Sequence, residues 1–283
     1  MKGEKNMTSN QVNLDYSQRE KIVKNIDSEL STNWKEGLEL LKSYDDNKSE
    51  ELKRDILAMV WRFGLKSQDS IVRQTMVNYM LNVFAKQSLF LQGQAIKFLQ
   101  DFSYTDFNNY AVNNISSLTW EGDYNYEIIL LVGIANIRTK IPELKKMAGN
   151  NWKVSGPNQL YSSCQWAASL VLARFGDIKI TKRIIEQVNE EQDIIVRSTR
   201  LFADLAYTRQ QLAFDTLRKY LHSQERLPQV KSTVPGQKEA IYAAEIFANF
   251  VVGCPVSGPD IEIEEVQKIK IWADRQSKWL FRD

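Results

Sequence analysis

The chain has very few of the residues on which most catalytic and metal sites depend. Among its 283 residues there is one histidine, His222, and there are two cysteines, Cys164 and Cys254. His-based triads and multi-histidine metal sites are therefore excluded. The residue types still permit a catalytic dyad of one cysteine with His222, or one disulfide bond between the two cysteines. The sequence favours free cysteines that pack as small apolar residues. No glycine-rich phosphate loop is present either, so the sequence predicts no catalytic residue, no metal and no cofactor.

Proline, glycine and long apolar runs are also scarce. Six prolines and 12 glycines leave few turns of the kind that a many-stranded sandwich needs, which favours helices. The longest apolar run, 128–135, contains Gly133 and is far shorter than the about 20 residues that cross a bilayer. Residues 1–20 are polar and show no secretory signal, so cytoplasmic is the default location. A periplasmic or secreted location stays open if a signal peptide had been removed.

An excess of either charge is absent as well. The 37 basic and 35 acidic residues give a formal net charge of +2 and are mixed along the chain. A dedicated nucleic-acid-binding protein usually carries a strongly basic surface, so this balance argues against nucleic acid as the partner.

Helical periodicity is present from Tyr16 onward. Residues 1–15 are rich in Lys, Asn and Ser and predict a disordered N-terminal tail. Residues 16–48 predict an N-terminal helical cap. Residues 49–283 predict a repeat array that is continuous with the cap, and Asp69 and Asp193 stand where helix N-caps are expected.

A short pattern recurs through the array. Six segments read apolar, usually Ala, polar, large apolar, and their last positions are separated by 30–45 residues. A repeat of about 35–45 residues that holds two helices is typical of an α-solenoid. Second helices are expected near 69–86, 105–118, 141–148, 178–189, 209–221 and 262–280. The six segments are 60–63, 99–102, 134–137, 172–175, 202–205 and 247–250.

Two helix starts resemble those of HEAT-like, armadillo-type repeat proteins. Asp193-Ile-Ile-Val-Arg197 looks like the aspartate-then-Val-Arg start of such repeats, and Asp69-Ser-Ile-Val-Arg73 is similar; 172–177 resembles their Gly-Asp ending. The resemblance implies an all-α, right-handed α-solenoid of about six antiparallel helix pairs. It also implies that Asp69, Arg73, Asp193 and Arg197 are structural residues that cap helices and connect neighbouring repeats. The two starts are 124 residues apart, which is not a whole number of repeats, so the helix that opens each pair stays undetermined.

Two long loops, 149–158 and 222–236, lie along one edge of the predicted array. Insertions on one edge of a solenoid often mark its binding face. The side chains expected to bind a partner combine aromatic rings with cations: Trp152, Lys153, Tyr161, His222, Arg226 and Lys231.

The sequence therefore favours a non-enzymatic interaction scaffold. Its partner would be a protein or peptide bound at the concave face and the loops between repeats. The alternative is a HEAT-like enzyme or nucleic-acid-binding protein of the DNA-repair glycosylase type, which would place a tryptophan and a carboxylate in a basic groove. The balanced charge argues against that alternative.

Overall fold

The computed structural model describes residues 14–47, 49–118, 125–149, 160–228, 236–257 and 261–282. Within these ranges the regular secondary structure is helical and no strand forms, which confirms the all-α prediction. Extended pairing there is confined to two isolated bridges, Arg226 with Lys238 and Val251 with Phe281. None of the described helices has both the length and the apolar character needed to span a bilayer. The tail predicted for 1–15 lies outside the described residues except for Leu14 and Asp15.

The chain forms two compact units, Met1–Leu118 and Thr119–Asp283. The helical periodicity predicted no boundary near Leu118, and the single continuous repeat array stays a prediction.

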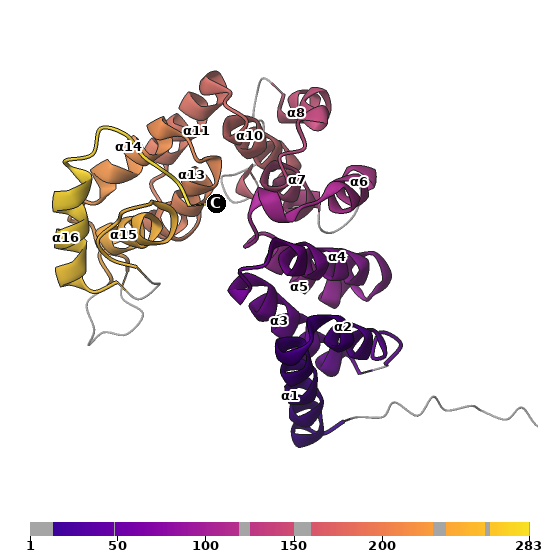
Figure 1. The fold of residues 1–283 in the computed structure, drawn as a ribbon. Coiled ribbons are helices and arrows are strands. Elements are labelled where there is room, and N and C mark those ends of the chain that lie inside the picture. The colour runs from indigo at the N-terminus through magenta and orange to yellow at the C-terminus, as the bar shows by residue number, and fades with distance from the viewer. Residues whose placement is uncertain are drawn as a thin grey trace, which may run out of the picture. The chain divides into compact units, whose positions relative to one another are not determined.

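Unit 1 consists of successive antiparallel helices. Their order is α1 (Tyr16–Thr32), α2 (Trp34–Lys42), α3 (Glu50–Lys66), α4 (Ser70–Lys86), α5 (Leu89–Leu99), the 3-10 turn η1 (Tyr104–Asp106) and α6 (Asn109–Ser117). Helix α1 packs on α2 and α3, α3 packs on α4 and α5, and α4 packs on α5 and α6. Figure 1 shows α1, α3 and α5 following one another in one row, with α2, α4 and α6 in a second row beside it.

The core of unit 1 lies between these rows. Ile26, Leu30 and Leu41 fill the space between α1 and α2 and are almost fully buried. A Cβ at Gly37 would stand 2.5 Å from the backbone nitrogen of Leu30, so only glycine lets α2 approach α1 this closely.

Unit 2 is built around α10, most of which is buried. Its elements are α7 (Asn125–Ile134), η2 (Arg138–Lys140), α8 (Ile141–Ala148), α10 (Cys164–Arg174), α11 (Ile178–Glu190), α12 (Ile194–Val196), the π-helical turn η3 (Arg197–Leu201), α13 (Phe202–Thr208), α14 (Gln211–Tyr220), α15 (Glu239–Phe250) and α16 (Ile263–Ala273). Helix α10 packs on α7, α8, α11 and α13; α13 packs on α14 and α15; and α15 packs on α16. Because α10 is surrounded in this way, every residue from Trp166 to Ala173 is buried.

Four of the six expected second helices agree closely with α4, α8, α11 and α14, but two predictions need correction. The helix expected over 105–118 is divided into η1 and α6, because the Asp106 carboxylate accepts the backbone N–H of Ser103 and closes a separate turn. The helix expected over 262–280 ends at Ala273.

Residues 274–282 turn back onto α15 in place of that last helical stretch. The backbone N–H of Val252 donates to Leu280 O at 2.8 Å, and that of Arg282 donates to Phe250 O at 2.9 Å. The Trp279 indole, which is 3% exposed, donates to Asp215 at 3.0 Å. The two backbone hydrogen bonds and the burial of this ring compensate for the helical hydrogen bonds that residues 274–282 do not form.

Three helices begin with the same pair of residues, an N-cap aspartate and an arginine four positions later, which we call the cap–clamp pair. The carboxylate of Asp69 accepts the N–H of Ile71 at 2.8 Å, and that of Asp193 accepts the N–H of Ile195 at 2.9 Å. The sequence predicted these two caps. It missed the third, Asp15, which accepts the N–H of Gln18 at 2.8 Å and precedes Arg19.

Each arginine of a cap–clamp pair connects its helix to the helix pair that follows. Arg73 Nε donates to Asp106 at 2.7 Å, and Arg197 Nε donates to Glu239 at 2.6 Å. Arg19 Nε donates to Asp55 in the same way at 3.3 Å. Each guanidinium also donates through Nη1 to a backbone carbonyl five or six residues earlier, that of Leu14, Ser67 or Glu191.

Replacing Asp193 with alanine should lower the free energy of unfolding by about 0.5–2 kcal/mol, because two orphan N–H groups at the start of α12 lose their acceptor. Those groups belong to Ile195 and Val196, at 2.9 and 3.3 Å from the carboxylate. Chemical denaturation measures the loss, and Asp193→Ser, which keeps an acceptor, should recover most of it. An unchanged unfolding midpoint in Asp193→Ala would contradict the capping role.

Candidate functional site: a groove between α1 and α3

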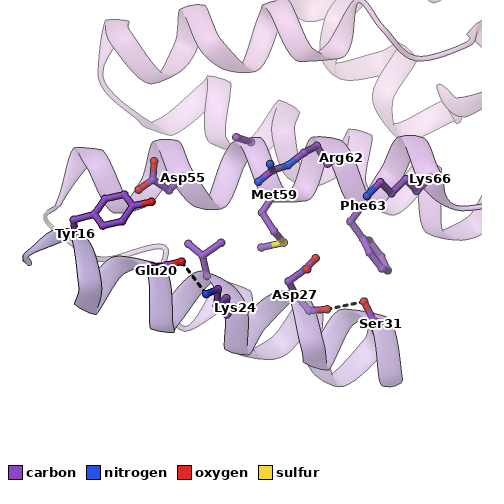
Figure 2. Close-up of a pocket in the computed structure, with 12 residues that line it drawn as sticks. Tyr16, Glu20, Lys24, Asp27, Ser31, Asp55, Met59, Arg62, Phe63 and Lys66 are labelled. Atoms are coloured by element: carbon purple, nitrogen blue, oxygen red, sulfur yellow. Dashed lines mark hydrogen bonds and ion pairs between the residues drawn. The ribbon is translucent and has the colours of Figure 1, made fainter. Parts of the chain in front are cut away.

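A groove lies between α1 and α3 in unit 1 and encloses a cavity lined by both helices. Its volume is about 610 Å³. Figure 2 shows side chains of both helices converging on the space between them. Helix α1 contributes Tyr16, Glu20, Val23, Lys24, Asp27 and Ser31, and α3 contributes Asp55, Ala58, Met59, Arg62, Phe63 and Lys66.

Local sequence positions both walls. Asp15 and Gln18 form a reciprocal capping box that fixes the start of α1, and Ser49 caps α3 by accepting the N–H of Leu52. Within each helix the groove residues recur every three or four positions, so they share one helical face. That spacing was the available sequence signal, but both stripes mix polar and apolar residues, and neither was singled out.

The floor of the groove is apolar. Met59 is 2% exposed, and Figure 2 shows its thioether directed from α3 toward α1. Val23 and Phe63 are half-buried beside it. A methionine and an aromatic ring give a floor that adapts to differently shaped apolar side chains.

At one end of the groove the charges neutralise one another. Lys24 Nζ lies 2.8 Å from the Glu20 carboxylate, whose hydrogen bond and negative charge raise the pKa of the Lys24 ammonium. The Asp55 carboxylate pairs with Arg19 at 3.3 Å and with Arg54 at 3.2 Å. These acids therefore have partners within unit 1 and leave little net charge.

The other end carries cations that no described carboxylate neutralises. Arg62 and Lys66 are exposed on successive turns of α3, and within the described residues neither forms an ion pair. Asp27 of α1 is the acidic group at this end, and Figure 2 shows it on the opposite wall. Two cations against one carboxylate give this end of the groove a net positive charge.

Of the residues that the sequence proposed for partner binding, the structure describes Tyr161, His222 and Arg226. Trp152, Lys153 and Lys231 lie outside the described residues. Tyr161 is fully buried and its hydroxyl donates to Glu191 at 2.7 Å, so it presents no surface to a partner.

The two remaining proposed residues lie at the base of the 222–236 loop. His222 Nε2 is 3.0 Å from Asp274, and Arg226 donates to Gly236 O at 2.9 Å. The groove between α1 and α3 contains none of these residues, so the sequence did not anticipate the candidate site.

Both cysteines are free thiols. Cys164 begins α10 and Cys254 follows α15, and burial raises the pKa of each thiol. Among the described residues, no three His, Cys, Asp or Glu side chains gather as a metal site would require.

Comparisons with protein-family models, curated proteins and solved structures each found no match to this chain.

Proposed function

We propose that this protein is a non-enzymatic interaction scaffold that binds a peptide segment of a partner protein in the groove between α1 and α3. The observation that carries the proposal is the groove itself, a cavity of about 610 Å³ with an apolar floor and two unneutralised cations at one end. Peptide-binding grooves of this kind anchor an apolar side chain in the floor and use the charged rim for orientation.

We further propose that the chain is a right-handed, HEAT-like α-solenoid. Its support in unit 1 is the order of packing, in which α1, α3 and α5 contact one another in succession. Its support in unit 2 is the connection from Arg197 to Glu239 in the next helix pair, which repeats the connection from Arg73 to Asp106 in unit 1. Connections limited to neighbouring repeats are the defining feature of solenoids.

The partner segment we propose is an acidic amphipathic helix. Apolar side chains spaced every three or four residues would contact Met59 and Phe63, and carboxylates beside them would pair with Arg62 and Lys66. A basic segment would encounter uncompensated like charge at that end of the groove.

One observation bears on the enzymatic alternative. In unit 2 the Asp204 carboxylate accepts the Trp166 indole N–H at 2.8 Å, which joins the residue types that a glycosylase-like site would use. Asp204 is only 8% exposed, however, and its second oxygen accepts from the Tyr126 hydroxyl at 3.4 Å. A carboxylate that acts on a substrate must reach it, so this arrangement favours a structural role and the scaffold proposal.

The test begins with selection from a display library of helical peptides about 15 residues long, roughly four helical turns, against the whole chain. Selected peptides should be rich in Glu, Asp and spaced apolar residues. Fluorescence polarisation should show binding at least about tenfold weaker to the double variant Arg62→Glu, Lys66→Glu, because two attractive charges become repulsive. Added salt should weaken binding to the wild type.

A matched control reverses the same number of charges elsewhere in unit 1. Lys86 and Lys97 are exposed and do not line the groove, so Lys86→Glu, Lys97→Glu should bind the selected peptides as the wild type does. Equal loss in both double variants, or selection of basic peptides, would refute the proposal. Met59→Lys, which places a charge in the floor, gives a third measurement and should also abolish binding.

A further inference from the structure

A second, smaller cavity lies in unit 2 at the base of the 222–236 loop. Its volume is about 90 Å³, which suits a single small ion rather than a nucleotide or a peptide. Its apolar lining comes from Leu221, Ala240, Ile241, Ile263 and Val266, and its polar lining from Ser223, Gln224, Lys238, Gln267 and Lys270.

The chain holds Lys238 in place by pairing the two ends of the loop. The N–H of Leu227 donates to Gln237 O at 2.9 Å, and Arg226 and Lys238 form an antiparallel bridge. A Cβ at Gly236 would stand 1.7 Å from Leu227 O, so glycine is required where the two ends meet. This base positions the backbone of Lys238 at the start of α15.

Two carboxylates at the base of the loop are engaged by other groups. Glu239, whose side chain is 1% exposed, accepts from Arg197 at 2.6 Å and from Ser223 at 2.7 Å. Glu225 pairs with the same arginine. Arg197 therefore pairs with both acids, and neither of them forms an ion pair with Lys238.

Two carboxylates on the facing helix α16 and just beyond its end are engaged too. The Glu265 carboxylate accepts the backbone N–H of Glu262 at 3.0 Å in the capping box of α16. Asp274, beyond the end of α16, lies 3.0 Å from His222. Lys238 and Lys270 are half-buried, and no ion pair to either is formed by the residues that the structure describes.

We infer that this cavity binds one phosphate-sized oxyanion between Lys238 and Lys270. Lys238, which precedes α15, and Lys270 of α16 both line the cavity, so their two positive charges match the charge of a phosphate dianion, and the side chain of Gln267 adds a neutral donor. The ion is either free inorganic phosphate or the phosphate of a phosphorylated serine in a partner protein. The site is separate from the α1–α3 groove and does not depend on the function proposed for it.

The experiment measures thermal stability during titration with inorganic phosphate, with sodium chloride adjusted to keep ionic strength constant. A ligand that binds only the folded chain raises the melting temperature in a saturable manner. A phosphoserine-containing peptide and its unphosphorylated form make up the second arm. If the melting temperature saturates with inorganic phosphate but not with the phosphopeptide, the ligand is the free ion. If the phosphopeptide saturates the site at a lower concentration than phosphate does, the ligand is a phosphorylated partner.

Lys238→Met and Lys270→Met should each weaken phosphate binding by about tenfold, because each removes one charge-assisted contact. Lys238→Arg keeps the charge and should retain binding. Retained binding in this variant would show that Lys238→Met weakens binding through the lost charge and not through a loss of folding. Lys268→Met and Lys278→Met remove exposed charges outside the cavity and should bind as the wild type does. Absence of saturation in the wild type, or equal loss in all four methionine variants, would overturn the inference.

Discussion

Replacing Arg197 with methionine should lower the free energy of unfolding by about 3–5 kcal/mol, the largest loss that we expect from a single polar residue of this chain. The substitution removes the cation that neutralises Glu239, whose side chain is 1% exposed. It also leaves the carbonyl of Glu191 without its guanidinium donor at 2.8 Å and removes the cation that lies 5.6 Å from the centre of the Tyr220 ring. A buried carboxylate without its counter-ion costs far more than the pair itself contributes.

Two variants make this expectation specific. In Arg197→Met, Glu239→Gln the buried charge is absent and the amide still bonds to Ser198 and Ser223, so the double variant should be more stable than Arg197→Met alone. Arg54→Met removes an exposed ion pair with Asp55 and should cost at most about 1 kcal/mol. Urea denaturation measures all three. A loss below 1 kcal/mol in Arg197→Met would mean that the clamp does not stabilise unit 2.

Asp204 should make the stability of unit 2 fall as the pH rises. Burial raises the pKa of its carboxyl to about 6, against a usual value of 3.8, although hydrogen bonds from Trp166 and Tyr126 and the charge of Arg200 lower it. Folding therefore favours the protonated carboxyl. The stability that this preference contributes is fully present below about pH 4 and is lost as the pH rises through about 6, a change on the order of 3 kcal/mol.

The neutral variant Asp204→Asn isolates this contribution from all other carboxylates. The free energy of unfolding of the wild type minus that of Asp204→Asn should decrease by about 2.5 kcal/mol between pH 4 and pH 7. Trp166→Phe removes a hydrogen bond that lowers the pKa, so it should move the transition to higher pH. A difference that does not change with pH would show that Asp204 titrates equally in both states.

Local sequence patterns were sufficient for most of the expected second helices and for two of the helix starts. The apolar positions of α3 and α4 recur at helical spacing, and Asp69 and Asp193 cap the helices that they precede, as predicted. These features depend on residues within about one helical turn of each other, so a single sequence contains the necessary information.

The sequence did not predict which carboxylates accept hydrogen bonds from the arginines of the cap–clamp pairs. Arg73 and Arg197 were recognised as connecting residues, but Asp106 and Glu239 lie 33 and 42 residues later in the chain. Nothing in their local sequence distinguishes them from solvated acids. Asp204, at the polar position of its repeated segment, is 8% exposed for the same reason, because helices distant in sequence cover it.

The sequence by itself determined that the chain is helical, where four of the six expected second helices lie, and that Asp69 and Asp193 cap the helices that follow them. Only the tertiary structure decided that Tyr161 is buried, that residues 274–282 turn back onto α15, and that α1 and α3 enclose a groove with Arg62 and Lys66 at one end. The physical reason is the range of the interactions. Helix periodicity and capping are local, whereas burial, ion pairing and cavities depend on packing between elements far apart in the chain.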